Sequence, residues 1–248
     1  MLTFIGLGLF DERSITLRGA EVLRGADRAF AEQYTSHLAG ASIGDLEGFH
    51  DVDIEVRDRA GLEQQPEPIL EAAAEGAVAF LTAGDTMIST THVDLRLRAH
   101  DRGVETRIVH GTTAQTAASS LTGLQNYRFG KATTLPFPET HGGVPKSVVG
   151  TVDANRERGL HTLVYLDIDG AEERYMTGDR AAALLADHVD GPGVVVAQAG
   201  SGDPTVRAGS LQALSAETFG QPLHLLVLPG DLHPLEREAL EALAGLSS

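Results

Sequence analysis

The chain has 248 residues, 42% of them hydrophobic, so it can bury a substantial core and form two domains of roughly 100–150 residues each. It contains no Cys, which excludes a disulfide scaffold, a thiolate metal site and a Cys nucleophile. No apolar run approaches the roughly 20 residues of a membrane helix, and the start at Met1 lacks the basic region of a signal peptide. We therefore expect a soluble, cytoplasmic protein that has no membrane partner.

The formal net charge of −16 at pH 7 indicates the environment of the protein and excludes one kind of partner. Lys131 and Lys146 are the only lysines, and every other basic residue is Arg. A large acid surplus with so little Lys is typical of a surface kept hydrated in concentrated salt, where a Debye length of about 3 Å screens self-repulsion. An ordinary acidic protein is the alternative. Because no basic stripe is present to neutralise phosphates, we expect no nucleic-acid partner.

Apolar runs alternate with helix-like stretches along the whole chain. The predicted strands are 2–9, 52–56, 78–81, 105–109, 133–137, 162–168, 193–198 and 223–228. The predicted helices are 14–23, 68–74, 92–101, 114–121, 146–158, 179–186, 205–215 and 234–244. In the third of these, Thr91 is expected to cap the start and Gly103 to stop the end.

This alternation predicts an α/β fold with a parallel or mixed sheet. The segment 110–113 is the best seam, because one α/β half would end there and another would begin. We therefore predict an N-terminal α/β domain at 1–110 and a C-terminal α/β domain at 111–248. A ligand cleft is expected between them, since strand ends and loops converge at such places.

The first strand leads into the segment 4–11, Phe-Ile-Gly-Leu-Gly-Leu-Phe-Asp. A dinucleotide-binding turn needs a third Gly three residues after Gly8, and Asp11 occupies that position. No Gly-x4-Gly-Lys-Ser/Thr phosphate loop is present either. Gly6 and Gly8 instead allow a ligand or another stretch of backbone to approach the end of the strand.

The strongest local signal is the segment 80–88, Phe-Leu-Thr-Ala-Gly-Asp-Thr-Met-Ile. An apolar strand ends there in Gly-Asp, which places Asp85 at the carboxyl end of a strand, where α/β sheets bind ligands. A carboxylate at this position can bind an amine or a ribose hydroxyl. The alternative is that Asp85 only turns the chain or caps a helix.

Three further segments have the pattern of a strand followed by a loop and a helix. These are 110–120, 197–209 and 228–234, and the last places His233 just before a helix. The ten histidines contain no His-Glu-x-x-His motif, so we expect no metal site. No Gly-x-Ser-x-Gly motif is present, so nothing suggests a serine hydrolase.

Taken together, these segments resemble the archaeal diphthine synthase family, which has a tetrapyrrole-methylase-like fold. The similarity begins with Phe-Ile-Gly-Leu-Gly-Leu-Phe-Asp-Glu-Arg-Ser-Ile-Thr at 4–16 and extends over essentially the whole chain in one order. Its other stretches are 31–36, 79–85, 90–99, 121–131, 157–163, 174–177, 205–209 and 229–233.

The resemblance implies two α/β domains, a homodimer and S-adenosylmethionine as methyl donor, with S-adenosylhomocysteine as product. It implies repeated methylation of the amine of a modified histidine on translation elongation factor 2, which is the methylation step of diphthamide synthesis. Carried over by position, the residues that bind the donor are Leu9, Asp85, Ile88, Thr113, Ala114, Leu166, Ala208 and His233. The resemblance identifies no residue that accepts the proton of the amine.

One departure from the family concerns the loop of Asp85. The family loop reads Pro-Gly-Asp-Pro, whereas this chain has Ala83 and Thr86 in place of the prolines. Without the two fixed proline rings, we expect a looser turn.

Two other functions stay open at the level of sequence. The first is a methyltransferase for corrinoid tetrapyrroles, which the same fold would serve. The second is a non-catalytic α/β module that binds some other nucleotide.

Overall fold

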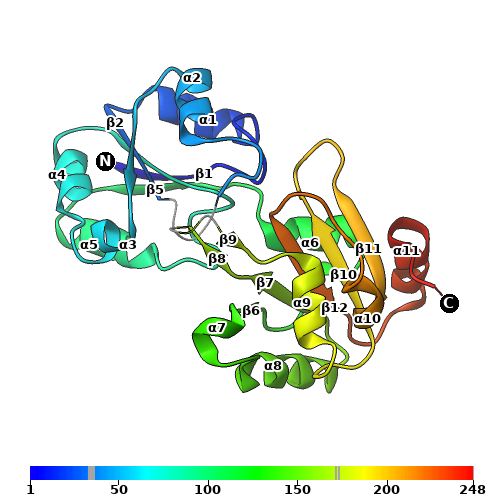
Figure 1. Ribbon diagram of the computed structural model, residues 1–248. Helices are drawn as coiled ribbons and strands as arrows, with labels where there is room; N and C mark the ends of the chain where they lie inside the picture. The colour runs from blue at the N-terminus through cyan, green and yellow to red at the C-terminus, as the bar shows by residue number, and fades with distance from the viewer. Residues whose placement is uncertain (33–36, 171, 173, 248) are drawn as a thin grey trace. The chain divides into compact units, whose positions relative to one another are not determined.

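The computed structural model describes residues 1–32, 37–170, 172 and 174–247 (Figure 1). Its internal contacts divide the chain into two compact units, a first unit at 1–113 and a second unit at 114–248. Within the described ranges, no helix combines the length and apolar character that a bilayer-crossing helix requires. Residues 33–36, the larger part of one stretch on which the family resemblance rests, lie outside the described residues.

The first unit is built around a five-stranded sheet with the order β3-β2-β4-β1-β5, in which every pair is parallel. Its strands are β1 (Leu2–Gly6), β2 (Arg28–Glu32), β3 (Ile54–Arg57), β4 (Val78–Thr82) and β5 (Thr106–Val109). Its helices are α1 (Leu17–Arg24), α2 (Ile43–His50), α3 (Arg59–Glu63), α4 (Glu67–Glu75) and α5 (Val93–Asp101). Because the strands are parallel, all of their carboxyl ends lie at the same edge of the sheet.

Helices cover both faces of this sheet (Figure 1). α1 and α2 contribute to the apolar cluster on one face, and α3, α4 and α5 contribute to the cluster on the other. Every residue of β1 and β4 is therefore buried, as their continuous apolar sequences predict. Phe4 and Phe80 pack edge to face within this core, with ring centroids 5.7 Å apart.

The second unit contains a mixed five-stranded sheet with the order β11-β10-β12-β7-β6 and a two-stranded β8-β9 sheet. Its strands are β6 (Thr133–Leu135), β7 (Thr162–Leu166), β8 (Ile168–Asp169), β9 (Arg174–Tyr175), β10 (Pro192–Ala197), β11 (Thr205–Ser210) and β12 (His224–Leu228). Its helices are α6 (Ala114–Thr122), the 3-10 helix η1 (Asn126–Arg128), α7 (Pro138–His141), α8 (Lys146–Arg156), α9 (Gly178–Leu185), α10 (Leu211–Leu214) and α11 (Pro234–Ala244). β6 runs parallel to β7, and the other pairs of the large sheet are antiparallel.

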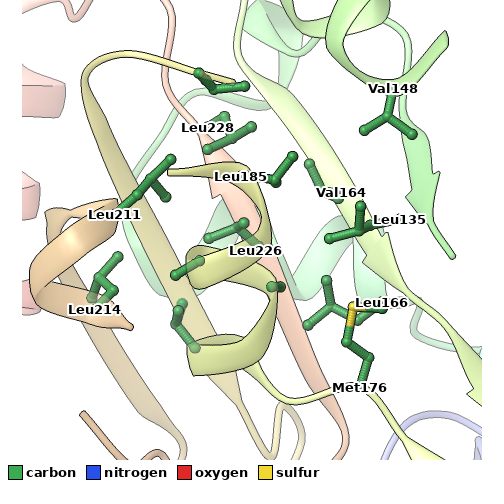
Figure 2. Packing of buried hydrophobic residues seen from close by; sticks show 14 of the residues in the cluster. Leu135, Val148, Val164, Leu166, Met176, Leu185, Leu211, Leu214, Leu226 and Leu228 are labelled. Atoms are coloured by element: carbon green, nitrogen blue, oxygen red, sulfur yellow. The ribbon is translucent and has the colours of Figure 1, made fainter. Parts of the chain in front are cut away.

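The core of the second unit has two sides, because alternate residues of each strand point to opposite faces of the sheet. Leu226 and Leu228 of β12 pack with α8, α9 and α10 in the cluster shown in Figure 2. Leu225 and Val227 belong to the cluster on the other face, together with residues of α6 and α11.

Most predicted elements are present, but the prediction for 205–215 is largely wrong. Residues 205–210 form β11, which pairs antiparallel with β10, and only Leu211–Leu214 is helical. The predicted helix is correct only at α10, and it extends too far toward the N-terminus, over the residues of β11. The segment 197–209, which the sequence predicts as a strand, a loop and a helix, is therefore the end of β10, a loop and most of β11.

Other differences from the predictions are local. The sequence predicts no counterpart of β2, α2, α3, η1, α7 or β9. β1 ends at Gly6 rather than at residue 9, because the glycine-containing turn begins there. α5 starts at Val93 after His92, without a side-chain cap from Thr91, whereas Gly103 follows its end with φ 71° as predicted.

Candidate functional site

Three backbone turns meet at the carboxyl edge of the first unit's sheet. The chain leaves the adjacent strands β4, β1 and β5 at this edge, so the turns that follow them are neighbours. Gly8 N–H donates to Gly84 O at 3.2 Å, and Gly84 N–H donates to Gly8 O at 2.6 Å. This reciprocal pair joins the turn after β1 to the turn after β4.

The glycines of these turns are required because backbone packs directly against backbone. A Cβ added at Gly6 would lie 2.5 Å from Gly84 O and 2.6 Å from Gly111 N, closer than real contacts. Gly8 and Gly84 both have positive φ, 79° and 76°, which L side chains rarely adopt. Of the two roles expected for Gly6 and Gly8, the structure shows the approach of another backbone segment.

Asp85 fastens the turn after β4 to the end of β5. Its Oδ2 accepts hydrogen bonds from His110 Nδ1 at 2.8 Å and from Gly111 N–H at 3.2 Å. Its Oδ1 accepts from Met87 N–H at 2.9 Å. The side chain is only 3% exposed, whereas His110 is 77% exposed. Asp85 therefore holds the turn in shape, the alternative considered from the sequence, and any ligand contact would be shared with these donors.

Four of the predicted donor-binding residues follow strands that end at this edge. Leu9 follows β1 and is half-buried, and Asp85 and Ile88 follow β4. The Ile88 side chain is 43% exposed, which is high for a large apolar residue. Thr113 follows β5 and is the last residue of the first unit. The parallel sheet thus gathers residues that are up to 104 positions apart in the sequence to one edge.

The second unit does not bring its four predicted residues together in this way. Ala114 opens α6, and Ala208 lies within β11; both contribute to the cluster on one face of the sheet. Leu166 ends β7 and is buried in the cluster on the other face (Figure 2). His233 precedes α11, beyond the end of β12.

Leu166 and His233 lie toward opposite ends of the sheet. β7 and β12 are antiparallel, and Leu228 at the end of β12 pairs with Thr162 at the start of β7. The chain that continues from β12 to His233 therefore starts at the edge where β7 begins, not where it ends at Leu166.

A buried ionic cluster that the sequence did not reveal lies beside His233. Glu236 is fully buried, and its Oε1 accepts from His161 Nε2 at 3.0 Å and from Gln125 N–H at 2.9 Å. Its Oε2 accepts from His233 N–H at 2.8 Å and lies 3.6 Å from Arg128 Nη1. The Glu236 cluster joins the start of α11 to η1 and to the start of β7.

The hydrogen bonds of this cluster fix the proton positions. His161 Nδ1 accepts from Gly230 N–H at 3.0 Å, so the ring's proton is on Nε2 and points to Glu236. Burial lowers the pKa of His161 although Glu236 favours the charged ring. Burial by itself would raise the pKa of Glu236, but hydrogen bonds from Gln125, His233 and His161 outweigh it and lower that pKa. The pair is therefore a neutral imidazole on an ionised carboxylate.

Part of this cluster has a signal in the sequence. Glu236 stands three residues after His233, the N-cap of α11, and reaches back to the N-cap backbone in a capping box. The acidic residue three positions after a helix start could have been noticed. His161 lies 75 positions away from Glu236, and no local pattern indicates that pairing.

The fold defines an α/β protein, and the carboxyl edge of a parallel sheet is where proteins of this class commonly bind ligands. The family model described as Tetrapyrrole (Corrin/Porphyrin) Methylases matches residues 1–215, and the chain belongs to this family. It is an S-adenosylmethionine-dependent methyltransferase with the tetrapyrrole methylase fold.

Similar proteins carry one name. The chain is 65% identical to a protein from Natronomonas pharaonis named diphthine synthase, over 99% of this chain and 96% of that one. It is 49% identical to a diphthine synthase from Methanosphaerula palustris, with 100% of both chains covered. A crystal structure described as that of diphthine synthase superposes with a TM-score of 0.92 at 37% identity, covering 99% of this chain and 96% of the other.

The close approach of the turns predicts a matched pair of glycine variants. Gly6→Ala should lower the free energy of unfolding by about 1–3 kcal/mol, because its methyl group would displace the backbone at Gly84 and Gly111. Gly48→Ala, in α2 with nothing within 4 Å of the new Cβ, should raise it by about 0.5–1 kcal/mol. Urea unfolding of both variants measures the difference, and a neutral Gly6→Ala would contradict the packing described.

The Glu236 cluster predicts a pH-dependent difference between two variants. At pH 7, Glu236→Gln should lower the free energy of unfolding by about 1–3 kcal/mol, because one acceptor of the cluster is lost. The pKa of Glu236 is below its unfolded value of 4.5, so its stabilisation is complete above about pH 4.5. This stabilisation is lost as the pH falls through the folded pKa. The difference in free energy of unfolding between Glu236→Gln and wild type should therefore narrow at low pH. Glu241→Gln, exposed on the same helix, should show no such gap.

Proposed function

We propose that this chain methylates the amino group of the modified histidine of translation elongation factor 2, forming diphthine in diphthamide biosynthesis. The observation that carries the proposal is the 65% identity to a diphthine synthase over 99% of this chain and 96% of the other. A match over nearly the full length of both chains supports a shared reaction, whereas fold alone would support only a shared architecture. We further propose that three methyl groups are added, since a trimethylated nitrogen has no lone pair left to react.

The carboxyl-edge turns of the first unit fit a nucleoside donor such as S-adenosylmethionine. Ile88 offers exposed apolar surface for a flat base, and Leu9, which follows the neighbouring strand β1, is half-buried. Gly84 leaves its surroundings open, since an added Cβ there would meet nothing within 4 Å. Backbone and apolar side chains at one sheet edge are the surfaces on which such ligands bind.

We propose that the eight residues carried over from the family contribute to donor binding. In the first unit these are Leu9, Asp85, Ile88 and Thr113, and the shared sheet edge supports them as one group. For the second unit, we propose Ala114, Leu166, Ala208 and His233 on the resemblance alone.

The chemistry asks more for positioning than for a protein nucleophile. S-adenosylmethionine, when bound, supplies a methyl group already activated by its positive sulfur; the N–C bond forms as the S–C bond breaks, and the bonding pair stays on sulfur. The protein must align a neutral amine with that methyl group, and such alignment is worth about 7–11 kcal/mol of the barrier. The ammonium proton must leave beforehand, to water or to a carboxylate. The surplus of acidic side chains favours a product that remains cationic.

We also propose that the protein acts as a homodimer in the cytoplasm, with elongation factor 2 as its macromolecular partner. The resemblance to the archaeal diphthine synthase family supports both. Sedimentation of the purified protein tests the dimer directly.

Label transfer tests the reaction. The protein is incubated with tritiated S-adenosylmethionine and elongation factor 2 that carries the unmethylated precursor on its histidine. Label on the modified histidine, with mass increments of up to three methyl groups, is the expected result. A corrinoid offered in parallel is the control acceptor. Label on the corrinoid with the protein factor inert would refute the proposal in favour of a tetrapyrrole methyltransferase.

The carboxylate of Asp85 provides a prediction on donor binding. Asp85→Ala should remain folded and should bind S-adenosylhomocysteine about tenfold or more weakly in a calorimetric titration, because the turn after β4 loses three accepted hydrogen bonds. Asp94→Ala is the control, since that carboxylate is 56% exposed and forms a surface ion pair with the partly exposed Arg98 on the same helix. Equal affinity of folded Asp85→Ala and wild type would remove Asp85 from the site.

A further inference from the structure

The backbone carbonyl of Thr86, next to Asp85, receives two hydrogen bonds from residues near the start of α5. Thr90 Oγ1 donates to it at 2.6 Å, and His92 Nδ1 lies 3.0 Å from it. One carbonyl in the turn after β4 is thus held by two side chains that follow it in the sequence.

The proton on the His92 ring is placed by its surroundings. The ring is 3% exposed and packs edge to face on Phe80, with centroids 5.0 Å apart. Burial lowers the pKa of His92, although the charge of Glu32 acts in the opposite direction, so the ring is neutral at pH 7 and carries one N–H. A carbonyl can only accept, so the proton is on Nδ1 and points to Thr86.

The other ring nitrogen cannot replace this bond. Nε2 of His92 is buried and has no hydrogen-bond partner among the described residues. Thr82 Oγ1 lies 3.5 Å from Nδ1, at the limit of a hydrogen bond, on the last residue of β4. Of these two contacts of Nδ1, the one to the Thr86 carbonyl is the shorter, at 3.0 Å.

Hydrogen bonds stabilise the turn after β4, in which this chain has no proline. Ala83 and Thr86 leave the backbone torsions of the turn free on both sides of Asp85. Asp85 accepts three hydrogen bonds, and the Thr86 carbonyl accepts two. The turn expected to be loose is therefore tied by side chains at its centre.

We propose that His92 is a positioning residue for donor binding: its Nδ1–H, together with the Thr90 hydroxyl, holds the Thr86 carbonyl and thereby sets the positions of Asp85 and Ile88. This inference rests on the proposed function, because it takes Asp85 and Ile88 as residues that contact the donor. His92 itself touches no ligand in this account and acts through the turn.

Two amide variants separate the two ring nitrogens. Asn at 92 places its amide N–H close to the position of Nδ1, whereas Gln places it close to the position of Nε2. His92→Asn should therefore bind S-adenosylhomocysteine within about threefold of wild type, and His92→Gln about tenfold more weakly. Thr90→Val should weaken binding severalfold because it removes the second donor, whereas Thr90→Ser keeps the hydroxyl and the affinity.

Hydrogen exchange of the ligand-free protein provides the second readout. Met87 N–H and Ile88 N–H bond to Asp85 within the turn. If His92 positions the turn, these amides exchange faster in His92→Gln than in His92→Asn, at equal thermal stability of the two variants. If His92 had only a structural role, both variants would change in melting temperature. Their affinity for S-adenosylhomocysteine and the exchange rates of their turn amides would then be equal.

Three results would overturn the inference. These are equal affinity of folded His92→Asn and His92→Gln, equal exchange of the turn amides in both, and a nitrogen NMR spectrum that puts the His92 proton on Nε2 in the unaltered protein. The NMR measurement needs no variant to fold. If the unaltered protein takes up no S-adenosylhomocysteine, the proposed function fails instead, and exchange still decides whether His92 holds the turn.

Discussion

The direct packing of backbone on backbone at the carboxyl edge of the first sheet is the constraint on which this unit depends. Gly6 and Gly111 leave no room for a Cβ, and Gly8 and Gly84 exchange hydrogen bonds across the gap. Asp85 closes the arrangement by accepting from the end of β5 and from its own turn. Because these contacts join three loops, we expect a disturbance in one loop to displace the other two. Gly6 and Gly8 thus fix the neighbouring turns by direct backbone contact.

Buried histidines recur as neutral clamps on the backbone. His92 donates to the Thr86 carbonyl, His161 accepts from Gly230 N–H, and His224 accepts from Gly178 N–H at 2.9 Å. Burial lowers the pKa of each ring below its unfolded value of 6.5. Their stabilisation is therefore complete above about pH 6.5 and is lost as the pH falls toward the folded pKa values. A ring with one N–H and one lone pair can match either a carbonyl or an amide, which suits it to irregular backbone.

Local pattern was sufficient where the structure is decided locally. The buried strands β1 and β4 follow from continuous apolar runs, and the Gly-Asp turn after β4 was recognised from its composition. The sequence does not predict β2, because Arg-Ala-Phe-Ala-Glu has little strand propensity. Its pairing between β3 and β4 makes it a strand. The sequence prediction misses β11 because it extends the helix at Leu211–Leu214 over residues 205–210, which the pairing with β10 makes a strand. Side-chain bonds such as His161 to Glu236 span 75 positions and have no local trace.

The two units differ in where they place residues that follow a strand. In an all-parallel sheet, all strands end at the same edge, and Asp85 and Thr113 both follow strands that end there. In the second unit, β12 runs against β7 and β10, so successive strand ends alternate between edges. Leu166 ends β7 and His233 follows β12, so the two residues lie toward opposite edges of the sheet. Ala197, which ends β10, lies at the edge where β7 ends, and that edge is the one that Leu166 marks.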